Sequence, residues 1–284
     1  MLGIMKLVID SNQLQTEQLR DFLGKSPRNI AVLPDFAAME AYKGDPLKSI
    51  FKSMSVLSDF PKQVVILKGS EKVCRLCGRV KGLRRRLVDE SQTRGFPDYI
   101  RTLKLAEAGN TSLQAQLSAL GHYANKHLDK MLRESENILS AIAVLGKSYT
   151  KEELALLRSK GKYSPELIDK LVIVILEMAA VIFKDSPLVR KTPTYAELPN
   201  TFFFRASFAF YLLVLRRFAN GGIGGLSLAT LRNDFVDMMF VAYATYFDGL
   251  MSSDKNAKYM FDETSLLLAA LFNAEVPSLA RLQK

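Results

Sequence analysis

The stretch Leu7-Val8-Ile9-Asp10-Ser11-Asn12 decides the fold. Its first half is a short apolar run rich in β-branched residues, which predicts a buried strand. Its second half, Asp-Ser-Asn, is typical of a strand end followed by a helix start, and Leu14 to Leu23 is expected to be that helix. The pattern therefore places the carboxylate of Asp10 at the carboxyl end of the first strand.

A second unit of the same kind follows. Ile30-Ala31-Val32-Leu33 predicts another buried strand, which Pro34 closes. The helix expected from about Asp35 carries Glu40. The chain thus opens with a β-α-β-α pattern in which acidic residues follow each strand.

The end of the chain repeats this pattern. Ser227 to Phe247 predicts a helix, and Gly249-Leu250-Met251-Ser252 predicts a short strand that leads into Asp254. Strands that alternate with helices at both ends favour one parallel sheet assembled from the two termini. Because sites in open α/β sheets form just outside the carboxyl ends of the strands, Asp10 and Asp254 are expected to lie close together.

The middle of the chain has an almost wholly helical pattern. Helices are expected at 112–145, 165–183 and 200–218, and Val64 to Leu67 is the only segment with an extended pattern. The glycine-rich run 220–225 predicts a flexible joint. We therefore expect an α/β core formed by residues 1–46 and 220–284, split by a helical insertion over residues 47–219.

Positive charge is concentrated in one part of this insertion. The formal net charge is +10, and between Lys68 and Lys104 the chain has eleven Lys or Arg against four Asp or Glu. Apolar residues at 73, 76, 80, 83 and 87 predict one helix with a single apolar stripe. Its other faces would carry Arg75, Arg79, Arg84, Arg85 and Arg86. Such a surface suits the phosphate backbone of a nucleic acid, but it is equally typical of an ordinary solvated helix.

Acidic residues from the two parts of the core form a candidate metal site. Glu40 and Asp237 would project from neighbouring helices toward Asp10 and Asp254, and Asp234 lies one helical turn before Asp237. Carboxylates this close cannot all stay ionised without a cation. Oxygen ligands favour Mg²⁺ or Mn²⁺, which can polarise a phosphodiester and activate a water for in-line displacement.

The residues that form this pattern resemble the PIN-domain nucleases. Val8-Ile9-Asp10-Ser11-Asn12 is similar to the family's opening motif, a strand that ends in Asp-x-Asn, and Met39-Glu40 resembles its second acidic position. Asn233-Asp234-Phe235-Val236-Asp237 and Leu250-Met251-Ser252-Ser253-Asp254 are similar to its third and fourth positions. The resemblance covers residues 1–46 and 220–284, and the long segment between them departs from the small members of the family.

The resemblance implies a three-layer α/β/α core with a parallel sheet and a metal-dependent nuclease activity. The implied catalytic metal ligands are Asp10, Glu40, Asp237 and Asp254. The implied auxiliary residues, which would orient carboxylates or water, are Asn12, Asp234 and Ser252. Because most of the family are ribonucleases, an endoribonuclease acting on RNA is expected. The alternatives are a DNA-cleaving enzyme of the same fold and an inactive PIN-like scaffold protein.

Other features bear on partners and location. No charged segment followed by an apolar one opens the chain, so a cytoplasmic protein is expected, and no apolar run reaches the roughly 20 residues of a membrane helix. A protein partner or a second copy of the chain would contact the helical insertion.

Three further sets of residues carry competing interpretations. Cys74 and Cys77 are too few for a disulfide framework and lack further zinc ligands, so buried free thiols are expected. Arg205 lies among Phe and Leu residues and would pair either with a site carboxylate or with a core acid. Phe96 and Tyr99 would either stack on single-stranded bases or anchor a helix.

Overall fold

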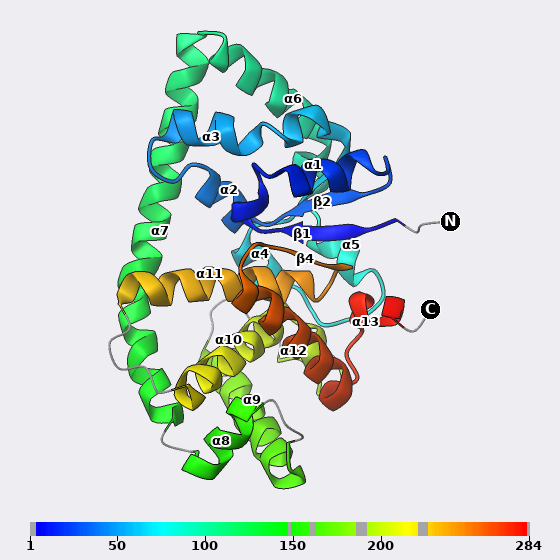
Figure 1. Ribbon diagram of the computed structural model, residues 1–284, viewed down its shortest axis with the longest axis vertical. Helices are drawn as coiled ribbons and strands as arrows, with labels where there is room; N and C mark the ends of the chain where they lie inside the picture. The colour runs from blue at the N-terminus through cyan, green and yellow to red at the C-terminus, as the bar shows by residue number, and fades with distance from the viewer. Residues whose placement is uncertain (1–3, 147–148, 160–162, 186–191, 221–226, 283–284) are drawn as a thin grey trace.

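The computed structural model describes residues 4–146, 149–159, 163–185, 192–220 and 227–282. They form a mixed α/β structure around a four-stranded parallel sheet with the strand order β3-β2-β1-β4 (Figure 1). The strands are β1 (Lys6–Ile9), β2 (Ile30–Leu33), β3 (Val64–Ile66) and β4 (Gly249–Met251). The prediction of one parallel sheet that joins the two ends of the chain is therefore confirmed.

The strand order reverses at β1. The chain builds outward from β1 through β2 to β3, and β4 then pairs with the opposite edge of β1. Leu7 lies opposite Ala31 on one side and opposite Gly249 on the other. The backbone amide of Asp10 donates to the carbonyl oxygen of Met251 at 3.0 Å. The carboxyl ends of β1 and β4 therefore flank a topological switch point, where ligand sites form in open α/β sheets.

Helices cover both faces of the sheet (Figure 1). One face packs against α1 (Glu17–Gly24), α3 (Pro46–Met54) and α6 (Glu90–Glu107). The other face packs against α11 (Leu228–Ala244) and α12 (Lys255–Phe272). Helix α10 (Phe202–Ala219) packs against these two helices. The long helix α7 (Thr111–Gly146) contacts α3, α6 and α11. The result is a three-layer α/β/α arrangement with further helices attached to it.

The remaining elements are short or peripheral. The other α-helices are α2 (Asp35–Ala41), α4 (Ser70–Cys74), α5 (Leu83–Leu87), α8 (Lys151–Ser159), α9 (Pro165–Asp185) and α13 (Pro277–Leu282). The 3-10 turns are η1 (Ser11–Gln13), η2 (Leu57–Asp59), η3 (Pro61–Gln63) and η4 (Leu198–Asn200). No helix within the described ranges is both long and apolar enough to cross a membrane.

Alternation along the strands explains the two layers of helices. Val8 and Val32 belong to the core shared with α10, α11 and α12, whereas Ile9, Ala31 and Leu33 belong to the core on the other face. All five side chains are buried. Strands buried on both faces are typical of parallel sheets whose connections are helical.

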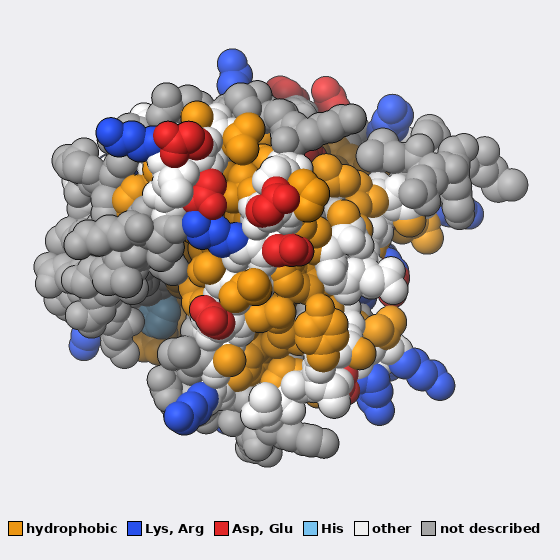
Figure 2. Space-filling model, turned by 90° about the horizontal axis from the view of Figure 1, so that it is seen from below, with side chains coloured by type: hydrophobic (Ala, Val, Ile, Leu, Met, Phe, Trp, Pro, Cys, Tyr) orange, Lys and Arg blue, Asp and Glu red, His pale blue; other side chains and the backbone are white. Residues whose placement is uncertain are grey.

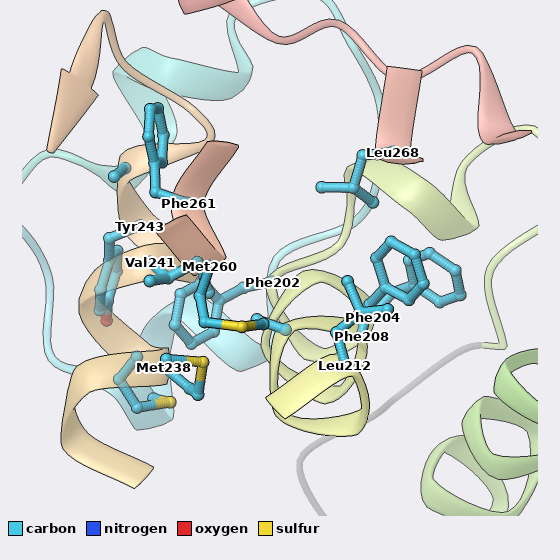
Figure 3. Close-up of a cluster of buried hydrophobic side chains, with 14 of the residues drawn as sticks. Phe202, Phe204, Phe208, Leu212, Met238, Val241, Tyr243, Met260, Phe261 and Leu268 are labelled. Atoms are coloured by element: carbon cyan, nitrogen blue, oxygen red, sulfur yellow. The ribbon is translucent and has the colours of Figure 1, made fainter. Parts of the chain in front are cut away.

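Aromatic side chains fill the core between α10, α11 and α12. Phe204 and Phe208 of α10 both meet Phe272 of α12 edge to face, with ring centroids 5.0 and 5.7 Å from it. Phe202 lies 4.3 Å from Tyr243 of α11, centroid to centroid. Figure 3 shows how side chains from the three helices meet in this cluster. Because such buried aromatic contacts stabilise a single packing geometry, the cluster holds α11 and α12 in place beneath the sheet.

The molecule seen from below carries hydrophobic side chains over the middle of its surface, with acidic side chains among them and Lys and Arg side chains mostly around the rim (Figure 2). Large exposed apolar residues on the lower helices include Ile173 of α9 and Leu266 of α12.

The expectation of a wholly helical segment over residues 47–219 is wrong in part. Val64–Ile66 is a sheet strand in which Val65 lies opposite Val32, so the extended pattern predicted for Val64 to Leu67 is confirmed. Pairing with β2 satisfies the backbone groups of this short run. The expected helices at 112–145, 165–183 and 200–218 are confirmed as α7, α9 and α10. The glycine joint falls mostly outside the described residues.

The expected continuous helix with an apolar stripe from Val73 to Leu87 is also wrong. It is interrupted between Cys74, where α4 ends, and Leu83, where α5 begins. Gly78 packs so closely on the backbone of Glu197 that an added Cβ would lie 1.9 Å from its carbonyl oxygen, and Gly82 has a φ of +71°. Tertiary packing and a left-handed glycine therefore override the helical periodicity.

Arg205 follows neither expected pairing. It is fully buried and donates to the carbonyl oxygens of Pro199, Thr245 and Glu275 at 2.8, 2.9 and 3.1 Å. Its guanidinium also stacks on the ring of Tyr246, 4.0 Å from the centroid. Carbonyl oxygens, not a carboxylate, therefore accept these hydrogen bonds. Through them Arg205 links α10 to three other segments of the chain.

Gly121 of α7 offers a test of the packing between α7 and α3. A Cβ at this position would lie 2.3 Å from Cβ of Pro46 and 3.0 Å from Cδ1 of Tyr42. Gly121→Ala is expected to lower the free energy of unfolding by about 1–3 kcal/mol because it overpacks this contact. Urea denaturation measures the change.

Gly95→Ala is the matched control, since it lies in another helix with no atom within 4 Å of an added Cβ. It should be neutral or stabilising by up to about 1 kcal/mol through its higher helix propensity. Equal stability of the two variants would mean that α7 does not pack closely on α3.

Candidate active site

The switch point between β1 and β4 brings Asp10 and Ser252 together. Both side chains are buried, with exposed fractions of 3% and 0%. The Ser252 hydroxyl and the Asn12 amide nitrogen each donate to Oδ2 of Asp10 at 2.5 Å. Asp10 precedes a short 3-10 turn but its side chain does not cap it. The carboxylate of Asp10 is therefore held by side chains from both ends of the chain.

Asn12 and Ser252 also tie together the two loops that follow β1 and β4. Oδ1 of Asn12 accepts from the backbone amide of Ser253 at 3.0 Å, and the Ser252 hydroxyl accepts from the amide of Asp254 at 3.0 Å. These bonds fix the loops in one relative position. Together with the bonds of Asn12 and Ser252 to Oδ2 of Asp10, they also fix the orientation of that carboxylate.

Glu40 reaches the same edge of the sheet from α2. Its side chain is 16% exposed, and its carboxylate accepts a hydrogen bond from the Ser11 hydroxyl, which also contacts Oδ1 of Asp10 at 3.3 Å. Ser11 therefore bridges the two carboxylates. Lys43 lies one helical turn away, with Nζ 3.9 Å from Oε1 of Glu40.

Asp254 lies at the site and also caps a helix. Its Oδ1 accepts from the backbone amides of Asn256 and Ala257 at 2.6 and 3.0 Å, which caps the N-terminus of α12. The ordinary interpretation of this residue as a helix cap is therefore correct. Its backbone amide, not its carboxylate, contacts the Ser252 hydroxyl.

Asp237 of α11 lies among the other acids. Burial, together with the neighbouring charges of Asp10, Asp254, Glu40 and Asp234, raises the pKa of its carboxyl group to about 8. The four other acids that the sequence singled out are therefore near enough to act on Asp237. They come from β1, α2, α11 and the loop before α12, which local sequence does not link.

A cleft of about 260 Å³ opens beside these acids. It is lined by Asp234, Asp237 and Asp254 together with Arg216 and Arg217 from the end of α10. Arg217 forms an ion pair with Asp234, which opposes the rise that burial causes in the pKa of that carboxyl group. The cleft thus places guanidinium groups directly beside carboxylates.

Arg216 is held in place by its neighbours. Its guanidinium lies 3.4 Å from the ring centroid of Tyr259, and its Nε donates to Oε2 of Glu263 at 2.8 Å. The hydroxyl of Tyr163 donates to the other oxygen of Glu263 at 2.8 Å. Such a stacked, hydrogen-bonded arginine loses little conformational freedom when it binds an anion.

The donor atoms of these carboxylates suit a hard divalent cation, but the side chains are not spaced as in a metal site. Their donor atoms are all oxygens, as Mg²⁺ and Mn²⁺ prefer, and the repulsion around Asp237 is the kind of charge that a cation relieves. Within the described ranges, however, no three His, Cys, Asp or Glu side chains already have the spacing of a metal site. Side chains would have to draw together around an ion.

The arginines between residues 75 and 86 do not line the cleft beside the acids. Arg84 pairs with Glu275, and a neighbouring hollow is lined by residues 80–85 together with Tyr246 and Glu275, which places it toward the amino end of β4. The other side chains are engaged nearby: Arg75 pairs with Glu71, Arg85 pairs with Glu90, and Arg86 donates to the carbonyl oxygens of Cys77, Arg79 and Lys81. Arg79 lines a second hollow with Lys68 and Lys81.

The cysteines do not form a disulfide. Cys74 is half-buried, and burial, with the charge of Asp35, raises its pKa to about 12. Cys77 is exposed in the loop between α4 and α5, so the expectation of a buried thiol is wrong for this residue. Its exposure follows from the interruption of the helix described above.

Sequence reasoning missed three residues of the site. They are Ser11, which lies within the Asp-Ser-Asn motif, and Arg216 and Arg217, which belong to no motif. Their position in the last turn of α10 is a common one for basic residues, which interact favourably with the helix dipole, so nothing local marks them. Only the packing of α10 against α11 and α12 brings them to the acids.

The chain was compared with protein-family models, with curated proteins and with solved structures, and none of these comparisons gave a match.

The raised pKa of Asp237 predicts a pH dependence of stability. Between its usual value of 3.8 and about 8, the folded protein retains a proton that the unfolded chain has lost, so stability falls as the pH rises through this window. In EDTA above pH 8, Asp237→Asn should raise the free energy of unfolding by roughly 2 kcal/mol, because it removes a buried charge among like charges. Urea denaturation at several pH values measures this.

At pH 4 the gain should nearly vanish, since both proteins are then neutral at this position. The exposed aspartate Asp21 on α1 supplies the control, and Asp21→Asn should show no such pH-dependent gain. A gain for Asp237→Asn that is the same at every pH would contradict electrostatic repulsion as its cause.

Proposed function

We propose that this chain is a metal-dependent nuclease with a PIN-like core, in which Asp10, Glu40, Asp237 and Asp254 bind Mg²⁺ or Mn²⁺. The single observation that carries the proposal is the convergence of these acids around Asp237, at the switch point of a parallel sheet. Asp10 is buried and the other three acids are half-buried, and an acid whose pKa is raised by burial and by neighbouring acids is a candidate functional residue. Such clusters are characteristic of metal-assisted phosphoryl chemistry.

The bound ion would polarise the phosphodiester, generate hydroxide from water and stabilise the leaving oxygen. The protein's own contribution is positioning. Ser252 and Asn12 hold Asp10 by hydrogen bonds to one oxygen, and Ser11 sets Glu40 relative to Asp10. The pKa of Asp237 is raised to about 8, and a bound cation would favour the ionised form of this carboxyl group.

The cleft beside the acids supplies the binding groups for the phosphate. Arg216 is oriented by Tyr259 and Glu263, and a guanidinium matches two phosphate oxygens at once. Arg217 neutralises Asp234 and limits the negative charge that an incoming phosphate meets. Without these two arginines, the acids would repel the substrate.

RNA is the proposed substrate on the strength of the family resemblance, and the net charge of +10 suits either nucleic acid. A second candidate is a non-catalytic PIN-like protein that binds a partner through its helical insertion. The observation in its favour is that no three acids in the described part of the chain already have metal-site spacing. Turnover separates the two candidates.

The deciding experiment is cleavage of labelled single-stranded RNA and matched DNA with Mg²⁺, Mn²⁺ or EDTA. Asp10→Asn and Asp237→Asn should each lower the rate by about 100-fold or more, the contribution of one group acting in the transition state. Asp21→Asn should leave the rate unchanged. Faster cleavage of RNA than DNA would support a ribonuclease, and the reverse would favour the DNA-cleaving alternative.

Three results would oppose the nuclease. They are no turnover of either nucleic acid with any ion, turnover that persists in EDTA, and turnover indifferent to both substitutions. Circular dichroism and thermal unfolding establish that each variant is folded, so that a lost rate reflects the site.

Ser252→Ala tests the positioning of Asp10 separately. Removing a hydroxyl that orients a metal ligand typically costs 10- to 100-fold in metal affinity, so half-maximal activity should need about that much more Mg²⁺. Ser253→Ala is the matched control, since the next residue is exposed and contributes only its backbone amide to Asn12. Metal titrations of activity measure both. An unchanged Mg²⁺ requirement in Ser252→Ala would show that Asp10 needs no such support.

A further inference from the structure

A second hollow of about 560 Å³ lies at the carboxyl ends of β2 and β3. Leu33 and Leu67 form its floor where these strands end, and side chains of α2, α3, α6 and α7 form its walls. Its volume is within the range of sites that hold small ligands, and its position follows the rule that such sites open outside the carboxyl ends of strands. It is separate from the cleft beside the acids.

Aromatic rings and one acid give this hollow its chemistry. Phe96 and Tyr99 of α6 contribute rings whose centroids are 5.9 Å apart, and the hydroxyls of Tyr42 and Tyr99 lie 3.0 Å from each other. Phe96 is buried and anchors α6, so an exposed stacking platform is not what these residues form. They instead form an apolar wall of the hollow, which is partly open to solvent.

Polar groups restrict the ligands that this hollow suits. None of the described residues that line it is Lys, Arg or His, and its one charged residue is Asp35. Asp35 accepts from the backbone amides of Ser70 and Phe36 at 2.7 and 3.1 Å, which leaves acceptor capacity on both oxygens. An anionic group would be repelled, whereas a neutral planar ring with N–H donors matches both the rings and the carboxylate.

Helix α2 connects the hollow with the acids. Asp35, Met39 and Tyr42 line the hollow, while Glu40 on the same helix binds Ser11 at the candidate active site. Helix α2 therefore contributes side chains to both sites, although the cleft beside the acids is lined by α10, α11 and α12.

We propose that this hollow binds one unstacked base of the nucleic-acid strand, next to the phosphate bound at the acids. This proposal rests on the proposed nuclease function, which supplies the nucleic-acid strand. Stacking against aromatic rings and hydrogen bonding to a carboxylate are how proteins hold a base outside a helix. A free nucleoside presents the same chemistry, so the test must separate the two.

Gly95 provides a way to close the hollow without touching the acids. It lines the hollow on α6, and no atom lies within 4 Å of an added Cβ. Gly95→Leu should therefore fill the space, and Gly95→Ala is its matched control. Ala38→Leu, on α2, closes the hollow from another wall and guards against a local defect in α6.

The experiment measures binding by fluorescence anisotropy of a short dye-labelled single-stranded RNA in EDTA, where no cleavage occurs. Replacing the base at one position by an abasic residue should weaken binding to the wild-type protein by about 5- to 100-fold, the loss of one stacked base. Gly95→Leu and Ala38→Leu should weaken binding of the intact RNA to a similar degree and be insensitive to the abasic change. Gly95→Ala should behave as the wild type.

Equal binding of intact and abasic RNA at every position would overturn the proposal, as would tight binding by both filled variants. Adenosine and uridine are tested in competition on the same proteins. A nucleoside that competes while abasic changes have no effect would assign the hollow to free nucleosides and also overturn the proposal. Cleavage with Mg²⁺ is scored separately, so loss of the base site and loss of the nuclease are told apart.

Discussion

The rest of the structure depends on the pairing of β1 with β4. This pairing brings Leu7 opposite Gly249 and Asp10 beside Met251, and it is the contact through which the last part of the chain enters the sheet. A shift of one residue would turn every side chain of β4 to the other face. Ser252 would then no longer reach Asp10, and α12 would begin in the wrong place. The register of one short strand therefore fixes the candidate site.

The site is held together against its own charge. Asp237 lies near four other acids, and its raised pKa records the cost of that arrangement. The compensation comes from packing: aromatic contacts among α10, α11 and α12 hold Asp237 and Asp254 where electrostatics alone would separate them. Arg205 of α10, buried and bonded to three carbonyl oxygens, strengthens the same framework. The helical layer under the sheet thus holds these acids in place.

Those parts of the structure that local patterns encode could be predicted from the sequence. Apolar runs followed by Asp10 and Asp254 define strand ends, and parallel strands bring such ends to one edge of a sheet. The ion pair of Arg217 with Asp234 could not be predicted, because it depends on how α10 crosses α11. The apolar spacing from Val73 to Leu87 predicts one continuous helix, and this prediction is wrong for a related reason. Gly78 packs on a distant backbone, at Glu197, which no local pattern reveals.

The place of β4 in the chain has a consequence for biosynthesis. A chain emerging from the ribosome presents Asp10 and Glu40 early, but the partners that complete the acid cluster follow near its other end. Contacts between residues so far apart in sequence form late, because a long loop must close before they stabilise anything. The nascent protein therefore passes through most of its synthesis with its acid cluster unassembled.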